Sequence, residues 1–260
     1  MSNLQKVLQG IVKFRKTGKA DLVKQFVNIR DTHAHPGAVF FSCMDARMFP
    51  ARITSTQVGD MYVVRNPGSM IPRAENSGSC GCETSLTTEA AGLELTVKRG
   101  GIKHVIICGH SNCKAMNTLY NLHKNPKKFD ANSPLDLWIR EHGFLSLKKL
   151  EERLASKTVQ PLKYSTPDGA FSFEAIIDEE NKYDVEDKLS QINTLQQMEN
   201  CASHGFLADI LAKKGADLHA MWFDIFAGET YLFSKPRRKF VLIDEKTVDS
   251  LQEEVKQHKA

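Results

Sequence analysis

Short apolar runs alternate with helical stretches along the chain, and this alternation limits the possible folds more than any other feature. Three such runs, rich in β-branched and aromatic residues, are AVFFSC (38–43), DMYVVRNPG (60–68) and HVIIC (104–108). Helical composition marks TSLTTEAAGLELTVKRGG (84–101), and another helix should begin near Ser111 or Asn112. Strands that alternate with helices predict an α/β fold with a mainly parallel central sheet and flanking helices.

The two ends of the chain extend this predicted core. Residues 1–30 should form an N-terminal helical arm, whose helically spaced apolar residues are Leu4, Val7, Leu8, Ile11, Val12 and Phe14. The first part of this arm is basic and lacks acids, which fits a mitochondrial presequence and equally a helix that packs on a neighbouring subunit. LHAMWFDIFAGETYLFS (218–234) predicts two strands around a glycine turn, a hairpin at the sheet edge. We expect one domain over residues 1–260, with its core at about 35–245.

Charge and hydropathy argue against several classes of partner. The net charge of +4 is small for 260 residues, so neither a nucleic acid nor a membrane partner is expected. No apolar run reaches the ~18 residues of a membrane span, and no secretory signal opens the chain. We therefore expect an intracellular protein, either cytoplasmic or mitochondrial.

Cysteine and histidine side chains follow two of the predicted strands. Cys43 ends the first run, and the turn GHSNC (109–113) follows the third, so both lie at carboxyl ends of strands, where parallel sheets bind ligands. His110 and Cys113 are three residues apart at a helix start and can face one point. Two thiolates and an imidazole suit Zn²⁺, and three protein ligands leave one tetrahedral position open, as in catalytic sites. We predict one Zn²⁺ per chain, held by Cys43, His110 and Cys113.

The other four cysteines have less specific surroundings. Cys108 and Cys201 are expected to pack in the core, as free cysteines commonly do. Cys80 and Cys82 form a CxC in a glycine- and serine-rich loop, which could be a second soft-metal or redox site. No matching His or Cys pair lies near them in the sequence, so packing or loop roles remain the alternative.

Taken together, the motifs CMDAR (43–47) and CGHSNC (108–113) resemble those of the β-class carbonic anhydrases. That family carries CxDxR after its first strand and HxxC about 65 residues later, the arrangement of Cys43 and His110 here. The likeness continues through GDMYVVRNPG and WFDIFAGETYLF, over about residues 5–245. The chain is identified as a zinc-dependent, metazoan-like member of the family. The resemblance implies reversible hydration of CO₂ to bicarbonate and a proton by zinc-bound hydroxide, in a homodimer that can pair into a tetramer.

The resemblance also implies roles for Asp45 and Arg47. Asp45 could accept a hydrogen bond from the hydroxide, or ligate zinc itself as a fourth ligand in a closed, inactive form. Arg47 would hold Asp45 in the acceptor role through a charge-assisted, bidentate bond. A surface ion pair is the alternative. Because two thiolates neutralise the charge of the metal, activity should rise towards alkaline pH.

A substrate pocket follows from the same likeness. Tyr62, Pro67 and Leu95 would form an apolar CO₂ pocket shared across the dimer interface. Plant-type members place a Gln nine residues before the first Cys and a Tyr fifteen before the His, where this chain has Ala34 and Leu95. The pocket of this chain should therefore differ from theirs.

The sequence leaves open the role of two histidines and two alternative functions. His33 and His35 flank the position of the absent Gln and could replace it or shuttle protons, or be ordinary surface residues. A non-catalytic zinc protein with the same fold is one competing class. Another zinc hydrolase on the same ligands, such as one that attacks carbon disulfide, is the other.

Overall fold

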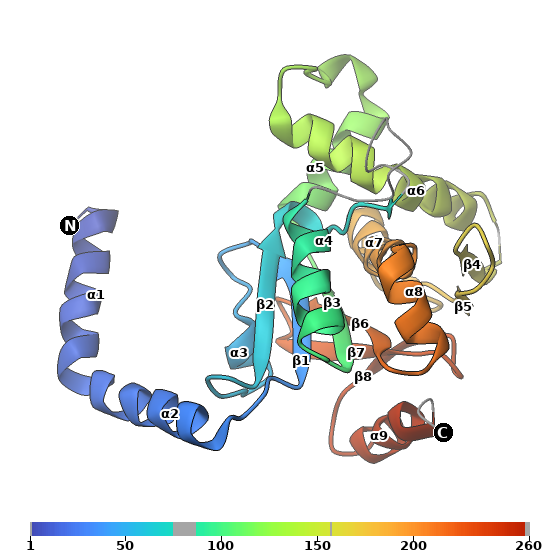
Figure 1. Cartoon of the computed structure of the whole chain (residues 1–260). Coiled ribbons are helices and arrows are strands. Elements are labelled where there is room, and N and C mark those ends of the chain that lie inside the picture. The colour runs from blue at the N-terminus through green and yellow to red at the C-terminus, as the bar shows by residue number, and fades with distance from the viewer. Residues whose placement is uncertain (1, 75–86, 157, 258–260) are drawn as a thin grey trace.

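A six-stranded sheet forms the centre of the computed structural model, which describes residues 2–74, 87–156 and 158–257 (Figure 1). Its strands are β1 (Ala38–Cys43), β2 (Met61–Asn66), β3 (His104–His110), β6 (Asp217–Asp224), β7 (Glu229–Ser234) and β8 (Lys239–Leu242). They lie in the order β2-β1-β3-β6-β7-β8. Strands β2, β1, β3 and β6 run parallel to one another, whereas β7 is antiparallel to its neighbours β6 and β8. The predicted α/β fold with a mainly parallel sheet is confirmed.

Helices α3 (Pro50–Ile53), α4 (Thr88–Leu93), α5 (Lys114–Lys124), α6 (Pro134–Ala155), α7 (Val185–Ala202), α8 (Gly205–Ala212) and α9 (Val248–Gln257) belong to the body of the chain around this sheet. Two further helices, α1 (Asn3–Thr17) and α2 (Lys19–Thr32), precede it. Shorter helical segments are η1 (Pro67–Ser69), the π-helix η3 (Glu94–Arg99) and η4 (Pro126–Lys128), and β4 (Leu162–Ser165) pairs with β5 (Ser172–Ala175) in a small second sheet. No described helix combines the length and the apolar character that crossing a membrane requires.

Both faces of β1 are covered, which explains its uninterrupted apolar sequence. Val39, Phe40 and Phe41 are at most 1% exposed although their side chains alternate between the two faces. The neighbours β2 and β3 pair with β1 on its two sides, with Cys43 opposite Asn66 and Ser42 opposite Cys108. β1 is therefore a fully buried central strand whose end is fixed by two partners.

Helix α7 lies directly against β3 and β6 and is buried along most of its length. A Cβ atom at Gly109 would stand 2.0 Å from Thr194 Oγ1, so only glycine allows this close approach. The helix carries many polar residues in spite of its burial, and several of them bond to loops at the carboxyl ends of the strands. Helix α7 thus positions the edge of the sheet at which the predicted ligands lie.

The N-terminal arm projects from the rest of the chain, as α1 and α2 in Figure 1. Helix α1 begins with a capping box in which Ser2 and Gln5 bond to each other's backbone N–H groups. Neither α1 nor α2 has a buried residue in the part of the chain that the structure describes. The helical arm is confirmed, and its apolar side chains lie open to solvent in a single chain.

Three details of the secondary structure differ from the expectation. Helix α5 begins at Lys114 with Cys113 as its N-cap, and not near Ser111 or Asn112, because Asn112 adopts a positive φ of 51°. The predicted C-terminal hairpin is β6–β7, but β8 pairs outside it and forms the sheet edge. The helix expected over 84–101 is described from Thr88 and turns into η3 at Glu94.

Candidate metal centre

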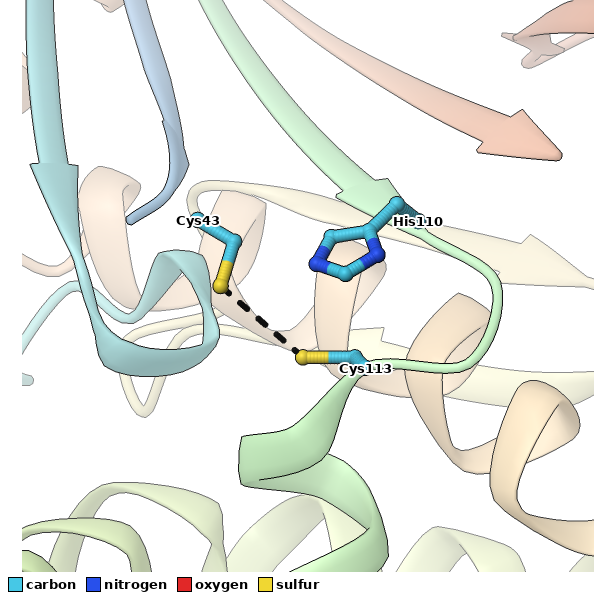
Figure 2. Close-up of side chains that lie close together, drawn as sticks. All are labelled: Cys43, His110 and Cys113. Atoms are coloured by element: carbon cyan, nitrogen blue, oxygen red, sulfur yellow. Dashed lines mark hydrogen bonds between the residues drawn. The ribbon is translucent and has the colours of Figure 1, made fainter. Parts of the chain in front are cut away.

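Three elements bring Cys43, His110 and Cys113 to one place. Cys43 ends β1 and His110 ends β3, and because these strands are parallel neighbours both residues emerge at the same edge of the sheet. Cys113 is the N-cap of α5, directly after the turn that follows β3. Figure 2 shows the three side chains directed towards a common point. The sequence prediction that they converge is confirmed.

The spacing of their ligand atoms fits a zinc ion. The two Sγ atoms and a ring nitrogen of His110 all lie within 4.8 Å of one another, and the three residues are buried. The sulfur atoms are 4.0 Å apart. Tetrahedral zinc with bonds of 2.3 Å would separate them by roughly 3.8 Å. Within the described residues, this is the one group of at least three His, Cys, Asp or Glu side chains close enough to hold a metal.

The ring of His110 is oriented for binding a metal through Nε2. Its Nδ1 lies 2.8 Å from the carbonyl oxygen of Ser111, a contact that requires the proton on Nδ1. The lone pair of Nε2 is then available, and among the described residues no group forms a hydrogen bond with this buried atom. A buried nitrogen without a partner is costly unless it binds something, so this atom supports a metal at the site.

The two thiols of the site differ in acidity. A hydrogen bond from Cys113 lowers the pKa of the Cys43 thiol to about 4, against the opposing effect of burial. The same bond, together with burial, raises the pKa of Cys113. The hydrogen bond between the two thiols therefore favours the loss of one proton from the pair, and a bound cation would favour the loss of the second proton as well.

Gly68 and Arg65 hold the end of β1 in place. The Gly68 N–H donates to Cys43 Sγ over 3.5 Å, and its φ of 84° is one that glycine adopts readily. A Cβ there would also crowd Met116 at 3.1 Å. The Arg65 side chain, on β2, donates to the carbonyl oxygens of Cys43 and Asp45. Both residues escaped the sequence analysis, although the pair Pro67–Gly68 signalled a turn.

Asp45 and Arg47 form a bidentate ion pair beside the three ligand residues. Arg47 Nε donates to Asp45 Oδ1 over 2.9 Å and Nη2 to Oδ2 over 2.7 Å, and the Arg47 backbone N–H also donates to Oδ1. These bonds hold the pKa of the Asp45 carboxyl well below its usual range. The side chain of Asp45 is 9% exposed and that of Arg47 is 36% exposed, so only the carboxylate side of the pair is buried. Asp45 does not belong to the group of side chains, within the described residues, that could hold a metal.

Comparisons with known proteins agree with this geometry. The family model described as carbonic anhydrase matches residues 38–230. Beta carbonic anhydrase 1 of Caenorhabditis briggsae is 54% identical over 97% of this chain and 93% of that protein, and its Caenorhabditis elegans counterpart is 53% identical over 95% and 91%. The chain belongs to the β-carbonic anhydrase family. Members of this family catalyse the hydration of CO₂.

Solved structures show the same fold. The β-carbonic anhydrase CcaA has a TM-score of 0.71 at 23% identity, with 95% of this chain and 94% of that chain covered. The Coccomyxa β-carbonic anhydrase has a TM-score of 0.64 at 20% identity, with 97% and 99% covered. These likenesses extend over the arm as well as the sheet, so the β-carbonic anhydrase fold accounts for almost the whole chain.

The loop between His110 and Cys113 of this β-carbonic anhydrase holds two residues that the sequence analysis considered only as the start of a helix. Ser111 Oγ donates to Asp224 and accepts from the Ile225 N–H. Asn112 accepts two hydrogen bonds from Arg47, at its side-chain and backbone oxygens. Nothing in the local sequence signals these contacts, because their partners lie in distant segments.

The predicted substrate residues lie at different places relative to the three converging side chains. Pro67 precedes Gly68, which bonds to Cys43, whereas Tyr62 pairs with Val39, four residues before Cys43. Tyr62 on β2 and Leu95 on η3 are 42% and 59% exposed. The carbonyl oxygen of Pro67 accepts a hydrogen bond from the Trp138 indole. His33 and His35 precede β1, whereas Cys43 stands at the end of that strand. Tyr62 and Leu95 therefore present apolar surface to solvent in a single chain.

The remaining cysteines lie apart from the site. Cys108 and Cys201 are at most 1% exposed, which agrees with their expected place in the core, and burial raises the pKa of Cys108 to about 12. Cys80 and Cys82 lie outside the described residues. The four described cysteines therefore separate into two ligand candidates and two core thiols.

Proposed function

We propose that this protein catalyses the reversible hydration of CO₂ to bicarbonate and a proton, with one Zn²⁺ per chain held by Cys43, His110 and Cys113. The observation that carries the proposal is the buried Cys-His-Cys group, with a partnerless His110 Nε2, next to the Asp45–Arg47 pair. Zinc held there supplies an acidic coordinated water and hence a nucleophile near neutral pH.

Asp45 acts as the hydrogen-bond acceptor that orients the nucleophile in this proposal. Its Oδ1 receives two N–H donors from Arg47, whereas Oδ2 receives one, which leaves acceptor capacity on Oδ2. Arg47 keeps the carboxylate ionised and turned towards itself. A rotation of Asp45 onto the metal, the closed form, would require these bonds to break.

The pocket for CO₂ is proposed to form between two copies of the chain. Tyr62 and Leu95 are exposed apolar residues at the β2 side of the sheet, and Pro67 follows β2. Among the structural neighbours, β-carbonic anhydrases of Sordaria macrospora are described as tetrameric, with a TM-score of 0.60. We propose a homodimer, able to pair into a tetramer, in which these three residues line the substrate pocket.

Stopped-flow CO₂ hydration on protein of known metal content tests the proposed function. We expect turnover well above buffer at about one zinc per chain. Protein that holds zinc and hydrates no CO₂ would favour the non-catalytic alternative. Turnover of carbon disulfide without turnover of CO₂ would favour the other hydrolase.

Turnover is expected to rise from acidic to alkaline pH. The pKa of Asp45 is lowered by Arg47, so its carboxylate stays ionised above pH 4 and cannot cause the rise. The rise then reports the ionisation of the water that supplies the nucleophile. Two thiolate ligands would raise the pKa of this water relative to a site with neutral ligands only, so its proton is lost at higher pH. Stopped-flow rates between pH 6 and 9 check this, and a flat profile would count against it.

The arm is expected to contribute to the dimer through the apolar face of α1. Ile11 lies at the middle of this face and is 52% exposed, whereas Gln9 lies on the opposite face. Ile11→Asp should weaken dimerisation at least about tenfold, because each copy would bury a charge. Gln9→Asp, which adds the same charge, should have little effect. Sedimentation velocity over a concentration series measures the dimerisation of both variants. Equal effects of the two substitutions would contradict the assignment of the apolar face of α1 to the dimer interface.

A further inference from the structure

Arg47 is held from two sides, and only one of them is Asp45. Its guanidinium has five N–H donors. Nε and one Nη2 proton serve Asp45, while Nη1 donates to Asn112 Oδ1 over 3.0 Å and Nη2 also donates to the Asn112 carbonyl oxygen over 2.9 Å. Asp45 and Arg47 are neighbours in one turn and could move together. Asn112 ties them to a segment 65 residues away.

Asn112 is itself fixed by the body of the fold. Its backbone N–H donates to Asp187 Oδ1, in the first turn of α7, over 2.6 Å. The preceding residue, Ser111, bonds through its N–H to the carbonyl oxygen of Phe223 on β6. The following residue is Cys113, the N-cap of α5. The segment therefore has anchors on a helix and on a strand, and can act as a rigid support for Arg47.

The conformation of Asn112 suits this task. Its φ of 51° lies in the left-handed region, which Asn tolerates better than most residues other than Gly. This conformation presents the side-chain oxygen and the carbonyl oxygen to the same guanidinium. A larger or β-branched residue would be strained there, and glycine would keep the backbone oxygen but lose the side-chain oxygen.

We propose that Asn112 is a positioning residue of this enzyme, which fixes Arg47 through the Nη1–Nη2 edge of its guanidinium, next to the Nε–Nη2 edge that binds Asp45. In this way Asn112 keeps the Asp45 carboxylate in its acceptor orientation. The inference rests on the proposed function, because orientation of Asp45 matters only if Asp45 acts in CO₂ hydration. Asn112 lies between His110 and Cys113, and neither zinc binding nor the Asp45–Arg47 pair by itself requires an asparagine at this position.

Asn112→Gly tests the proposal with a minimal change to the backbone. We expect kcat to fall about tenfold with KM and zinc content unchanged, because one charge-assisted bond to Arg47 is lost. Asn112→Asp, which restores an oxygen acceptor at the same place, should recover most of kcat. Ser55→Gly, another exchange at positive φ (51°) in the loop that leads to β2, is the matched control and should behave as wild type.

A second readout does not depend on activity. Phenylglyoxal modification followed by peptide mass spectrometry measures the reactivity of each arginine, and the Arg47 side chain is 36% exposed in the native protein. Arg47 should react severalfold faster in Asn112→Gly than in wild type, while the other arginines keep their rates. Unchanged reactivity of Arg47, or an unchanged kcat, would overturn the proposal. If the wild-type protein did not hydrate CO₂, the proposed function would be refuted instead. The reactivity of Arg47 would still decide whether Asn112 holds the Arg47 side chain in place.

Discussion

Cys43→Ser is expected to remove zinc from the protein and to lower CO₂ hydration on the order of a thousandfold or more. Serine offers a harder and far less acidic atom in place of a thiol whose pKa the Cys113 hydrogen bond lowers to about 4. It also loses the bond that the Gly68 N–H donates to sulfur. Metal analysis and stopped-flow hydration on the same preparation measure both effects.

Two controls separate metal loss from a general loss of folding. Cys201→Ala removes a buried thiol on α7 that lies outside the ligand group, and should keep zinc and turnover. Chelator-treated wild type should unfold at the same temperature as Cys43→Ser, since both lack the ion, and added zinc should restore only the wild type. Retention of one zinc per chain in Cys43→Ser would remove Cys43 from the ligand set.

Arg47→Ala is expected to keep zinc and lose turnover by about a hundredfold or more. Arg47 is not one of the three proposed zinc ligands, whereas it donates three hydrogen bonds to the Asp45 carboxylate, two of them from its side chain. Without them the carboxylate is free to turn, and its pKa returns towards the ordinary range. Stopped-flow rates with zinc quantified beforehand test this directly.

Two further variants, Arg47→Lys and Arg52→Ala, serve as comparisons for Arg47→Ala. Arg47→Lys should recover little activity, because an ammonium group cannot form the bidentate bond to Asp45 and also reach Asn112. Arg52→Ala on α3 removes the same charge and should leave the rate near wild type. Wild-type turnover in Arg47→Ala would exclude Arg47 from the mechanism.

The sheet and the ligands were predictable from the sequence because their signals are local. AVFFSC and HVIIC are short apolar runs that only a buried strand explains well, and parallel neighbours place Cys43 and His110 at one edge. The spacing of His110 and Cys113 needed only the turn between β3 and α5. The motif CMDAR then indicated the Asp-Arg pair through the family resemblance.

What could not be predicted depends on contacts between distant segments. The sequence suggested Asn112 as the N-cap of the following helix. Its bonds to Arg47 and Asp187 instead stabilise a left-handed conformation, so that the N-cap is the next residue, Cys113. The strand β8 was missed because KFVL is short and follows a basic turn. The exposure of Tyr62 and Leu95 could not be predicted either, because both belong to apolar stretches that were expected to be covered.

The separation of the ligands along the chain has a consequence for how the protein matures. Cys43 and Cys113 are 70 residues apart, and the pairing of β1 with β3 brings them together in the folded chain. Before that pairing, closure of so long a loop opposes metal capture. We therefore expect zinc to bind after the sheet has assembled. The three candidate donor side chains lie together in the folded chain, so we expect the folded apoprotein to take up zinc without unfolding.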